Sequence, residues 1–400
     1  MKKLPEHDLR VALLSTLDHS PALGRIRPAF RHFAGSRIIE RQVDLALAAD
    51  CGTIACLVDG IGREVIEAQK RAEAAGVRFV AMQETRPLSG LVSAADEIFV
   101  VGAGLLPADE VVLKYSVRPS VLVFPAEDAV PLGYERIDAE FAWAGVFLAH
   151  GSTVERLAEL PPDADVISAL LRIALQSGVR IQPIEKRLID VGRWHLDPTV
   201  EQLDEREQQW IRDHAAAASF AAPGLAVSER IGARLAKDVL GGRWARLPAI
   251  LAGLSGVIAM SLALLGWEIT ALGFGALMAM LGAAGETVER IALAGQAAAR
   301  RSALARTIDW LTDPVLAILI ALASPEDTEW LRLFVPVVLF GLLRLGHRMV
   351  GSRFRETYRD RVALSILLLP AAFLGIVQPV TAVLVLLVML SLFFAPTSGE

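Results

Sequence analysis

Four carboxylates in the C-terminal half of the chain are spaced so that pairs of them share a helix face. Glu286 and Glu289 are three positions apart, and Asp309 and Asp313 are four apart, which places each pair on one side of a helix. Two neighbouring helices would then bring four oxygen-donating side chains together. Oxygen-rich clusters suit Mg²⁺ or Mn²⁺, which in turn bind phosphates. The spacing therefore predicts a divalent-metal site formed by these four residues.

Arginines near the carboxylates leave a second interpretation open. Glu286 and Glu289 could pair with Arg290 or Arg300 and only end a helix at the level of lipid headgroups. The aspartates have no obvious partner at i,i+4 spacing beyond Arg306, so the metal interpretation is stronger for them.

A second group of arginines follows in the chain, at Arg344, Arg348 and Arg353. These side chains could bind the phosphate of an acceptor or a product. They could equally attract anionic lipid headgroups, which is the simpler expectation.

The elements that must position these residues are six apolar stretches. They are 247–267, 269–285, 308–323, 330–346, 362–377 and 379–395. Each is close to the roughly 20 residues that cross the hydrocarbon core as a helix. Two of them could instead be buried helices of a soluble domain, but six in series argue against that. We expect an all-α six-helix transmembrane domain over residues 246–400, where ionisable side chains are functional candidates because they are costly to bury.

The distribution of arginine among the loops also predicts the orientation of this domain in the membrane, because cytoplasmic loops carry an excess of basic residues. The breaks after the second and fourth stretches are rich in arginine, whereas the break after the first holds Glu268 and the one after the third holds Glu326, Asp327 and Glu329. Both termini should then be cytoplasmic. The apolar run near the N-terminus is too short for a signal peptide, which agrees with a cytoplasmic N-terminal domain on a multi-pass inner-membrane protein.

The carboxylate pattern resembles the CDP-alcohol phosphatidyltransferase family, whose six-helix membrane enzymes carry two paired metal-binding aspartates. Asp309-x3-Asp313, followed by a proline, matches the second pair. Glu286-x2-Glu289 keeps the spacing of the first pair but lacks the family's Gly and Ala-x-Arg. Aligning Arg290 with the family's arginine instead would make it a phosphate-binding residue and would place two metal positions on glycines.

The resemblance implies a membrane phospho-alcohol transferase with a CDP-activated donor, a polyol or polyol-phosphate acceptor, and Mg²⁺ or Mn²⁺. The metals would polarise the diphosphate. Asp313, and otherwise Asp309, would be the catalytic base that deprotonates the acceptor hydroxyl. The competing hypothesis is a noncatalytic homologue that binds lipid or nucleotide, or partners an active transferase. A homodimer is compatible with either.

The N-terminal half alternates in the manner of an α/β fold. Short strands rich in Val, Ile and Leu are expected at 10–15, 53–58, 77–82, 97–101, 121–124 and 179–184, with helices between them such as 36–49, 63–75 and 165–176. Continuous apolar strands separated by helices predict a Rossmann-like, mostly parallel sheet covered on both faces. Sites in such sheets lie beyond the carboxyl ends of the strands, so the loop 16–28 is the first place to search.

Residues 1–200 resemble the nucleotidyltransferases that activate sugars or phospho-alcohols. The segments that carry the resemblance are Arg27-Pro28, Gly35 to Gln42, and Asp190-Val191-Gly192. The order of the two domains also resembles the bifunctional cytidylyltransferase and phosphatidyltransferase fusions that act on inositol phosphate. In such a domain Arg25 and Arg27 would bind nucleotide or phosphate, although a solvated basic loop is an equal alternative.

Two departures predict that this domain has lost nucleotidyl transfer. The first loop has a single glycine, Gly24, where close approach of phosphates needs several unshielded N–H groups. The segment 101–104, Val-Gly-Ala-Gly, has no carboxylate where the family has a metal-binding aspartate.

Residues 201–245 are expected to link the two domains. A charged helix is predicted at 204–218, and an amphipathic helix at 228–239 has a basic face. The second could lie in the membrane interface or be an ordinary linker helix.

Composition excludes some functions. Residues 1–245 have a net charge of −6 and residues 246–400 of +1, so neither half predicts nucleic-acid binding. Cys51 and Cys56 have no histidine pair nearby and are expected to be buried structural residues.

Overall fold

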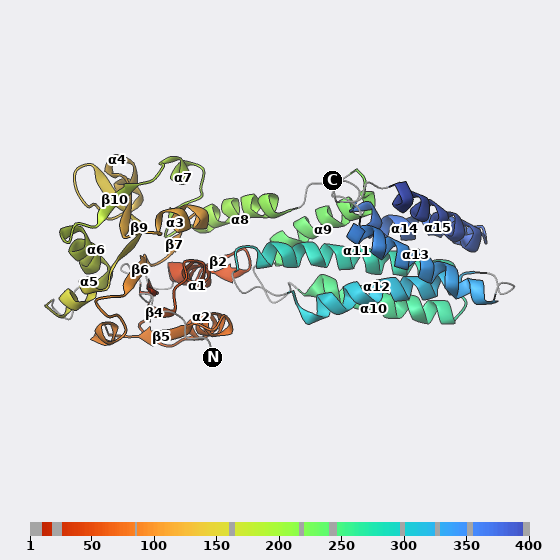
Figure 1. The fold of residues 1–400 in the computed structure, drawn as a ribbon, viewed down its shortest axis with the longest axis horizontal. Helices are drawn as coiled ribbons and strands as arrows, with labels where there is room; N and C mark the ends of the chain where they lie inside the picture. Colours follow the sequence, from red (N-terminus) through yellow and green to blue (C-terminus); the bar gives the residue numbers. More distant parts are fainter. Residues whose placement is uncertain are drawn as a thin grey trace. The chain divides into compact units, whose positions relative to one another are not determined.

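The structure is a computed structural model that describes residues 10–17, 26–84, 86–159, 165–215, 220–239, 246–296, 301–324, 329–349 and 355–394. The chain divides into two compact units, the first formed chiefly by residues 1–209 and the second chiefly by residues 210–400. We call them the α/β domain and the helical domain (Figure 1).

The α/β domain is built on a seven-stranded sheet with the order β10-β8-β9-β6-β1-β4-β5. Its strands are β1 (Arg10–Ser15), β4 (Thr53–Leu57), β5 (Arg78–Met82), β6 (Glu97–Val101), β8 (Ser120–Pro125), β9 (Phe141–His150) and β10 (Arg180–Pro183). Every neighbouring pair is parallel except the two that involve β9, which is antiparallel to β6 and β8. The expected mostly parallel sheet is confirmed.

Both faces of this sheet are covered, because successive residues of each strand enter different cores. On β1, Ala12 and Leu14 belong to one hydrophobic cluster, whereas Val11 and Leu13 belong to another. The first cluster includes α1 (Ile38–Ala48), α2 (Arg63–Ala74) and α3 (Asp109–Tyr115). The second includes α5 (Ser152–Glu155) and α6 (Val166–Gln176). The expected helices at 36–49, 63–75 and 165–176 are α1, α2 and α6.

Six short elements complete this domain. They are β2 (His32–Phe33), β3 (Ser36–Arg37), β7 (Leu105–Leu106), α4 (Ala126–Ala129), α7 (Arg187–Asp190) and β11 (His195–Leu196), the last paired with β7. Helix α8 (Val200–His214) follows, and its Arg206 donates to the carbonyls of Leu106 and Pro107 at 2.5 and 2.7 Å. The start of α8 is thereby fixed to the α/β domain, inside the segment predicted to be a linker.

The helical domain begins with α9 (Pro223–Val239) and continues with six helices. These are α10 (Leu247–Leu264), α11 (Glu268–Leu293), α12 (Ala303–Leu322), α13 (Glu329–Met349), α14 (Arg361–Phe373) and α15 (Val377–Phe394). All six apolar stretches are therefore helical. Among the described residues four helices are long and apolar enough to cross a membrane, at Leu247–Leu264, Glu268–Leu293, Trp330–Arg348 and Val377–Phe394. Six spans are not confirmed, because α12 carries charged residues and α14 is only 13 residues long.

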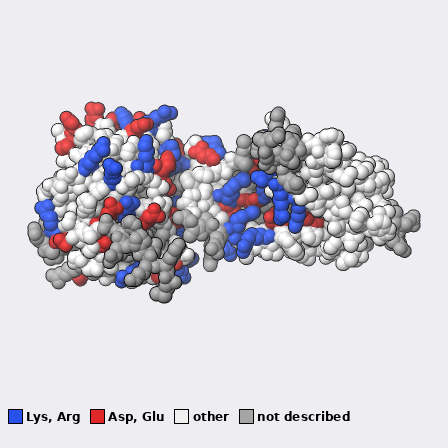
Figure 2. Space-filling view, viewed as in Figure 1, with Lys and Arg blue, Asp and Glu red and all other residues white. Residues whose placement is uncertain are grey.

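Charge is distributed unevenly over the helical domain. In Figure 2 the Lys, Arg, Asp and Glu side chains that can be seen on this domain gather at one end, and the other described residues of the visible face are coloured as uncharged. The domain also exposes large apolar side chains, among them Leu264, Trp267, Phe334 and Phe393. An extended apolar surface next to a charged end is the pattern expected of helices in a lipid bilayer.

Candidate functional site

A pocket of about 590 Å³ opens at the charged end of the helical domain. Its walls come from the C-terminal part of α11, the first half of α12, the end of α13, and the segment from Tyr358 to Val362, with Leu225 of α9 and Ala249 of α10. Its ionisable lining residues are Glu286, Arg301, Arg306, Asp309, Asp313, Arg344, His347, Arg348, Arg359 and Arg361. Six arginines thus face three carboxylates in one cavity, a surplus of three positive charges.

Local sequence positions these side chains. On α12, Asp309 and Asp313 are one turn apart, and the helix begins at Ser302, whose hydroxyl accepts a hydrogen bond from Ala305 N at 3.2 Å. On α11, small residues such as Gly282 and Gly285 line the cavity beside Glu286. A Cβ at Gly282 would lie 3.6 Å from Ile308 of α12, and one at Gly285 would lie 3.4 Å from Ala249 N of α10, so small residues let α11 pack closely against both helices.

Asp313 is held by two arginines. Its Oδ1 accepts a hydrogen bond from Arg361 Nε at 2.6 Å, and its Oδ2 accepts from Arg344 Nε at 2.6 Å and from Arg361 Nη2 at 3.1 Å. The side chain of Asp313 is only 9% exposed, so the carboxylate is largely removed from water. Bidentate arginine contacts of this kind are strong and geometrically specific.

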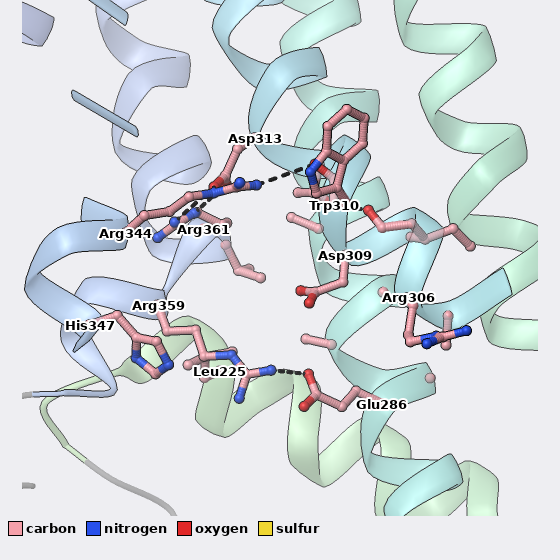
Figure 3. Close-up of a pocket in the computed structure, with 18 of the residues that line it drawn as sticks. Leu225, Glu286, Arg306, Asp309, Trp310, Asp313, Arg344, His347, Arg359 and Arg361 are labelled. Carbon is pink, nitrogen blue, oxygen red and sulfur yellow. Dashed lines mark hydrogen bonds and ion pairs between the residues drawn. The ribbon is translucent and has the colours of Figure 1, made fainter. Parts of the chain in front are cut away.

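Glu286 is held in the same way from another direction. Its Oε2 pairs with Arg359, and its Oε1 lies 3.3 Å from Arg301 Nη2. Figure 3 shows Arg359 crossing the floor of the pocket to reach this glutamate. Two of the predicted metal ligands therefore already have cationic partners on both oxygens.

Asp309 differs from these two carboxylates. It is exposed, and Figure 3 shows its side chain extending from α12 into the open centre of the pocket. Within the described part of the chain, no hydrogen bond or ion pair reaches its carboxylate. The interaction of Asp309 with Arg359 is a longer-range electrostatic attraction. Asp309 is thus a carboxylate that a ligand could meet directly.

Glu289 does not line the pocket, although it is one turn from Glu286. Its Oε1 accepts a hydrogen bond from Ser302 N at 2.6 Å, and its Oε2 lies 3.9 Å from Arg301 Nε. Arg290 is also outside the pocket, where it pairs with Glu229 of α9 at 3.4 Å. The structure therefore brings together Glu286, Asp309 and Asp313 of the four predicted carboxylates.

A divalent cation requires several oxygen ligands that converge on one point. Among the described residues, no group of three or more His, Cys, Asp or Glu side chains is placed to hold a metal ion. A cation at Asp313 or Glu286 would have to displace arginines from short, charge-assisted contacts. The side chains as arranged do not fit Mg²⁺ or Mn²⁺, and the metal-binding role of the four carboxylates stays a prediction.

Arginines outside the four-carboxylate pattern complete the site. Arg344 and Arg348 line the pocket, whereas Arg353 lies outside the described residues. The contact of these arginines with a phosphate or a headgroup stays a prediction. Arg301, Arg359 and Arg361 also line the pocket, although the sequence pattern assigned them no role in the site. Arg301 lies just before α12, Arg359 lies just before α14, and Arg361 begins α14, so no helical spacing relates these arginines to the carboxylates that they contact.

Of the two arginines predicted to bind phosphate in the α/β domain, only Arg27 is among the described residues. Arg27 pairs with Asp59 and lies over the ring of Phe30, beside an open pocket of about 280 Å³ next to the loop after β4. Arg25 and most of the first loop lie outside the described residues. Asp190 ends α7 and is exposed.

The segment that lacks the expected carboxylate is closely packed. Gly104 has a φ of +67°, and a Cβ placed on it would collide with Pro28. Gln42 donates to the carbonyls of Gly102 and Leu105 at 2.9 and 2.8 Å. Backbone and side chains thus fill the carboxyl end of β6, where the resemblance would have placed an aspartate.

Comparisons with known proteins give matches among solved structures alone. No family model matches the chain, and no curated protein matches it. Among the solved structures that match is the inositol-1-phosphate CTP transferase from T. maritima, with 13% sequence identity and a TM-score of 0.36. That similarity covers 50% of this chain and 96% of the other.

Proposed function

We propose that the helical domain is embedded in a membrane and binds a phosphate-bearing head group in its arginine-lined pocket. The observation that carries this proposal is the surplus of positive charge in one cavity, where six arginines face three carboxylates. Guanidinium groups match phosphate oxygens in charge and geometry. The arginine-rich loops would place this end of the domain on the cytoplasmic side, at the depth of lipid phosphates.

Two of these arginines are available for a ligand. Arg306 and Arg348 are exposed in the pocket, and no ion pair of either side chain is found within the described residues. Figure 3 places Arg306 on the opposite side of the pocket from His347 and Arg344. A head group between them would meet cations from both α12 and α13.

Binding by the purified full-length protein in phosphatidylcholine nanodiscs tests the proposal. Short-chain CDP-diacylglycerol and phosphatidic acid should bind, and short-chain phosphatidylcholine should compete poorly. Inorganic pyrophosphate in a parallel titration distinguishes a lipid head group from a free phosphate. Arg306→Ala and Arg348→Ala should each weaken binding by roughly tenfold, since each removes a charge-assisted contact. Failure of every phosphate-bearing probe to bind would refute the proposal.

A second candidate function is transfer of a phospho-alcohol from a CDP-activated donor to a polyol or polyol-phosphate. The exposed Asp309 favours it, because a general base must reach the acceptor hydroxyl. The arginines would hold the donor phosphates, and Asp309 would take the proton from the acceptor. Noncatalytic binding of the same head group remains the alternative, and measurement of CMP release separates the two.

A further inference from the structure

Two of the carboxylates that were predicted to bind a metal are engaged by guanidinium groups instead. Asp313 accepts hydrogen bonds from Arg344 and Arg361, and Glu286 pairs with Arg359 and Arg301. We propose that these arginines take the place of a divalent cation, so that the pocket binds the phosphate of a head group without a metal ion. This inference rests on the proposed function.

The arginine that makes two hydrogen bonds to Asp313 is fixed from several sides. Arg361 is 13% exposed, donates to the carbonyl of Tyr358 as well as to Asp313, and has its guanidinium 5.6 Å from the centre of the Phe340 ring. It also begins α14, directly after Asp360, which is the N-cap of that helix. A side chain with this many partners is not easily displaced by an incoming cation.

The other arginines retain donors that could reach a phosphate. Arg344 uses Nε for Asp313 and Nη2 for the carbonyl of Trp310, at 3.3 Å, and its side chain is 43% exposed. Arg359 is 37% exposed. A guanidinium has five N–H donors, so each can hold its carboxylate and still face a ligand. Figure 3 shows both groups bordering the same open space.

This arrangement reverses the expected effect of removing a carboxylate. In a metal site, Asp313 and Glu286 would hold the cation, and their amide variants would lose the ligand together with the metal. In an arginine site, the same variants release guanidinium groups from their internal partners. The released charges then act on the bound phosphate, so binding should become tighter.

The experiment measures binding of short-chain phosphatidic acid and CDP-diacylglycerol to the full-length protein in phosphatidylcholine nanodiscs. Each titration is made in EDTA and again with excess Mg²⁺ or Mn²⁺. We expect the same affinity in all three conditions. Glu286→Gln and Asp313→Asn should tighten binding by about threefold to tenfold, because each frees charge-assisted donors.

Glu97→Gln is the matched control. It also removes one carboxylate, 23% exposed, and frees one arginine, Arg10. Both residues belong to strands of the α/β domain, and neither lines the pocket, so affinity should stay unchanged. Thermal unfolding checks that each variant is folded. Glu286, which is 24% exposed, decides the result if the more deeply buried Asp313→Asn variant does not fold.

Three outcomes are distinguishable. Binding that persists in EDTA and tightens in the amide variants supports metal-independent recognition. Binding that requires Mg²⁺ or Mn²⁺, or that weakens in Glu286→Gln, overturns this inference but leaves the proposed function standing. No binding of either probe in any condition refutes the proposed function, and this inference with it.

Discussion

The carboxylate of Asp360 and the backbone of Gly224 join the beginnings of two helices that are 136 positions apart in the chain. Asp360 Oδ2 accepts a hydrogen bond from Gly224 N at 2.8 Å, and its Oδ1 accepts from Ala363 N at 2.9 Å. One buried side chain thus satisfies N–H groups at the starts of α9 and α14. Since Arg359 and Arg361 are its neighbours in sequence, this contact also positions two arginines of the pocket.

Replacement of Gly224 by alanine should destabilise the helical domain. A Cβ at this position would collide with Asp360 Oδ1 and lie 2.8 Å from Val362 Cβ. We expect a loss of about 1–3 kcal/mol, typical of overpacking, seen as a fall in the melting temperature of the purified protein. Gly253→Ala in α10 is the control, because a Cβ there meets no atom within 4 Å. Equal melting temperatures for Gly224→Ala and the wild type would contradict this account of the contact.

Much of the α/β fold follows from sequence periodicity. The expected strands at 10–15 and 97–101 coincide with β1 and β6, and the other four expected strands differ by one residue at one or both ends. The prediction missed β9, the strand that makes the sheet mixed. Its sequence contains three alanines and a glycine, which have weak strand propensity. Gly145 has a φ of +93° in the part of β9 opposite the register shift between Val121 and Val123.

The candidate site was predictable only in part. Helical spacing placed Asp309 and Asp313 on one helix and close to Glu286, and all three line the pocket. Spacing could not show that Arg359 and Arg361 return to these carboxylates, because that depends on how the chain turns between α13 and α14. Spacing also predicted a site role for Glu289, which does not line the pocket. It is three positions from Glu286, but its side chain accepts a hydrogen bond from Ser302 N at the start of α12.

The local stability of the β7–β11 pair should depend on His195. Burial, followed by the charge of Arg206, lowers the pKa of His195 to about 4 from 6.5. The unfolded state therefore binds a proton that the folded state refuses between pH 6.5 and pH 4, and stability falls as the pH is lowered through this range. His195→Gln should remove that dependence.

The pH dependence of stability is measured for the wild type and for His195→Gln by hydrogen exchange of the peptide that contains β11. The exchange rates are corrected for the intrinsic effect of pH. Burial also raises the pKa values of Asp44 and Asp109 to about 6, which makes stability fall as the pH rises from about 4 to about 6. These opposing effects cancel when the variant is compared with the wild type. Parallel pH profiles for the two proteins would show that His195 titrates normally.

Labelling of single cysteines should reveal the orientation of the helical domain. The arginine-rich breaks predict that Glu356→Cys is reached only from the cytoplasm and Glu268→Cys only from outside. Both positions are exposed. Native Cys51 and Cys56 are buried, and burial raises their thiol pKa values to about 12, so they should react slowly with maleimide. Labelling of Glu356→Cys by an impermeant reagent in intact cells would show that the orientation is the reverse of the predicted one.

If the pocket catalyses transfer, kcat should depend on Asp309 much more strongly than on Asp313. Asp309 is exposed in the pocket, whereas Asp313 has both oxygens engaged by arginines. A carboxylate that holds two guanidinium groups is a weak base, because those contacts stabilise its charged form. We therefore expect Asp309→Asn to lower kcat by about 100-fold or more, the usual scale of general-base catalysis. Its KM for the donor should change little, because the arginines that bind the phosphates remain.

The measurement is release of CMP from CDP-diacylglycerol with a panel of polyols and polyol phosphates, with and without Mg²⁺ or Mn²⁺. Asp313→Asn should act mainly on KM and on stability, since it alters the positions of Arg344 and Arg361. Glu97→Gln, in the α/β domain, serves as the unaffected control. A loss of kcat in Asp313→Asn with normal Asp309→Asn would make Asp313 the base and would require its arginines to move during turnover. Absence of CMP release from the wild type with every acceptor, alongside retained head-group binding, would favour the noncatalytic alternative.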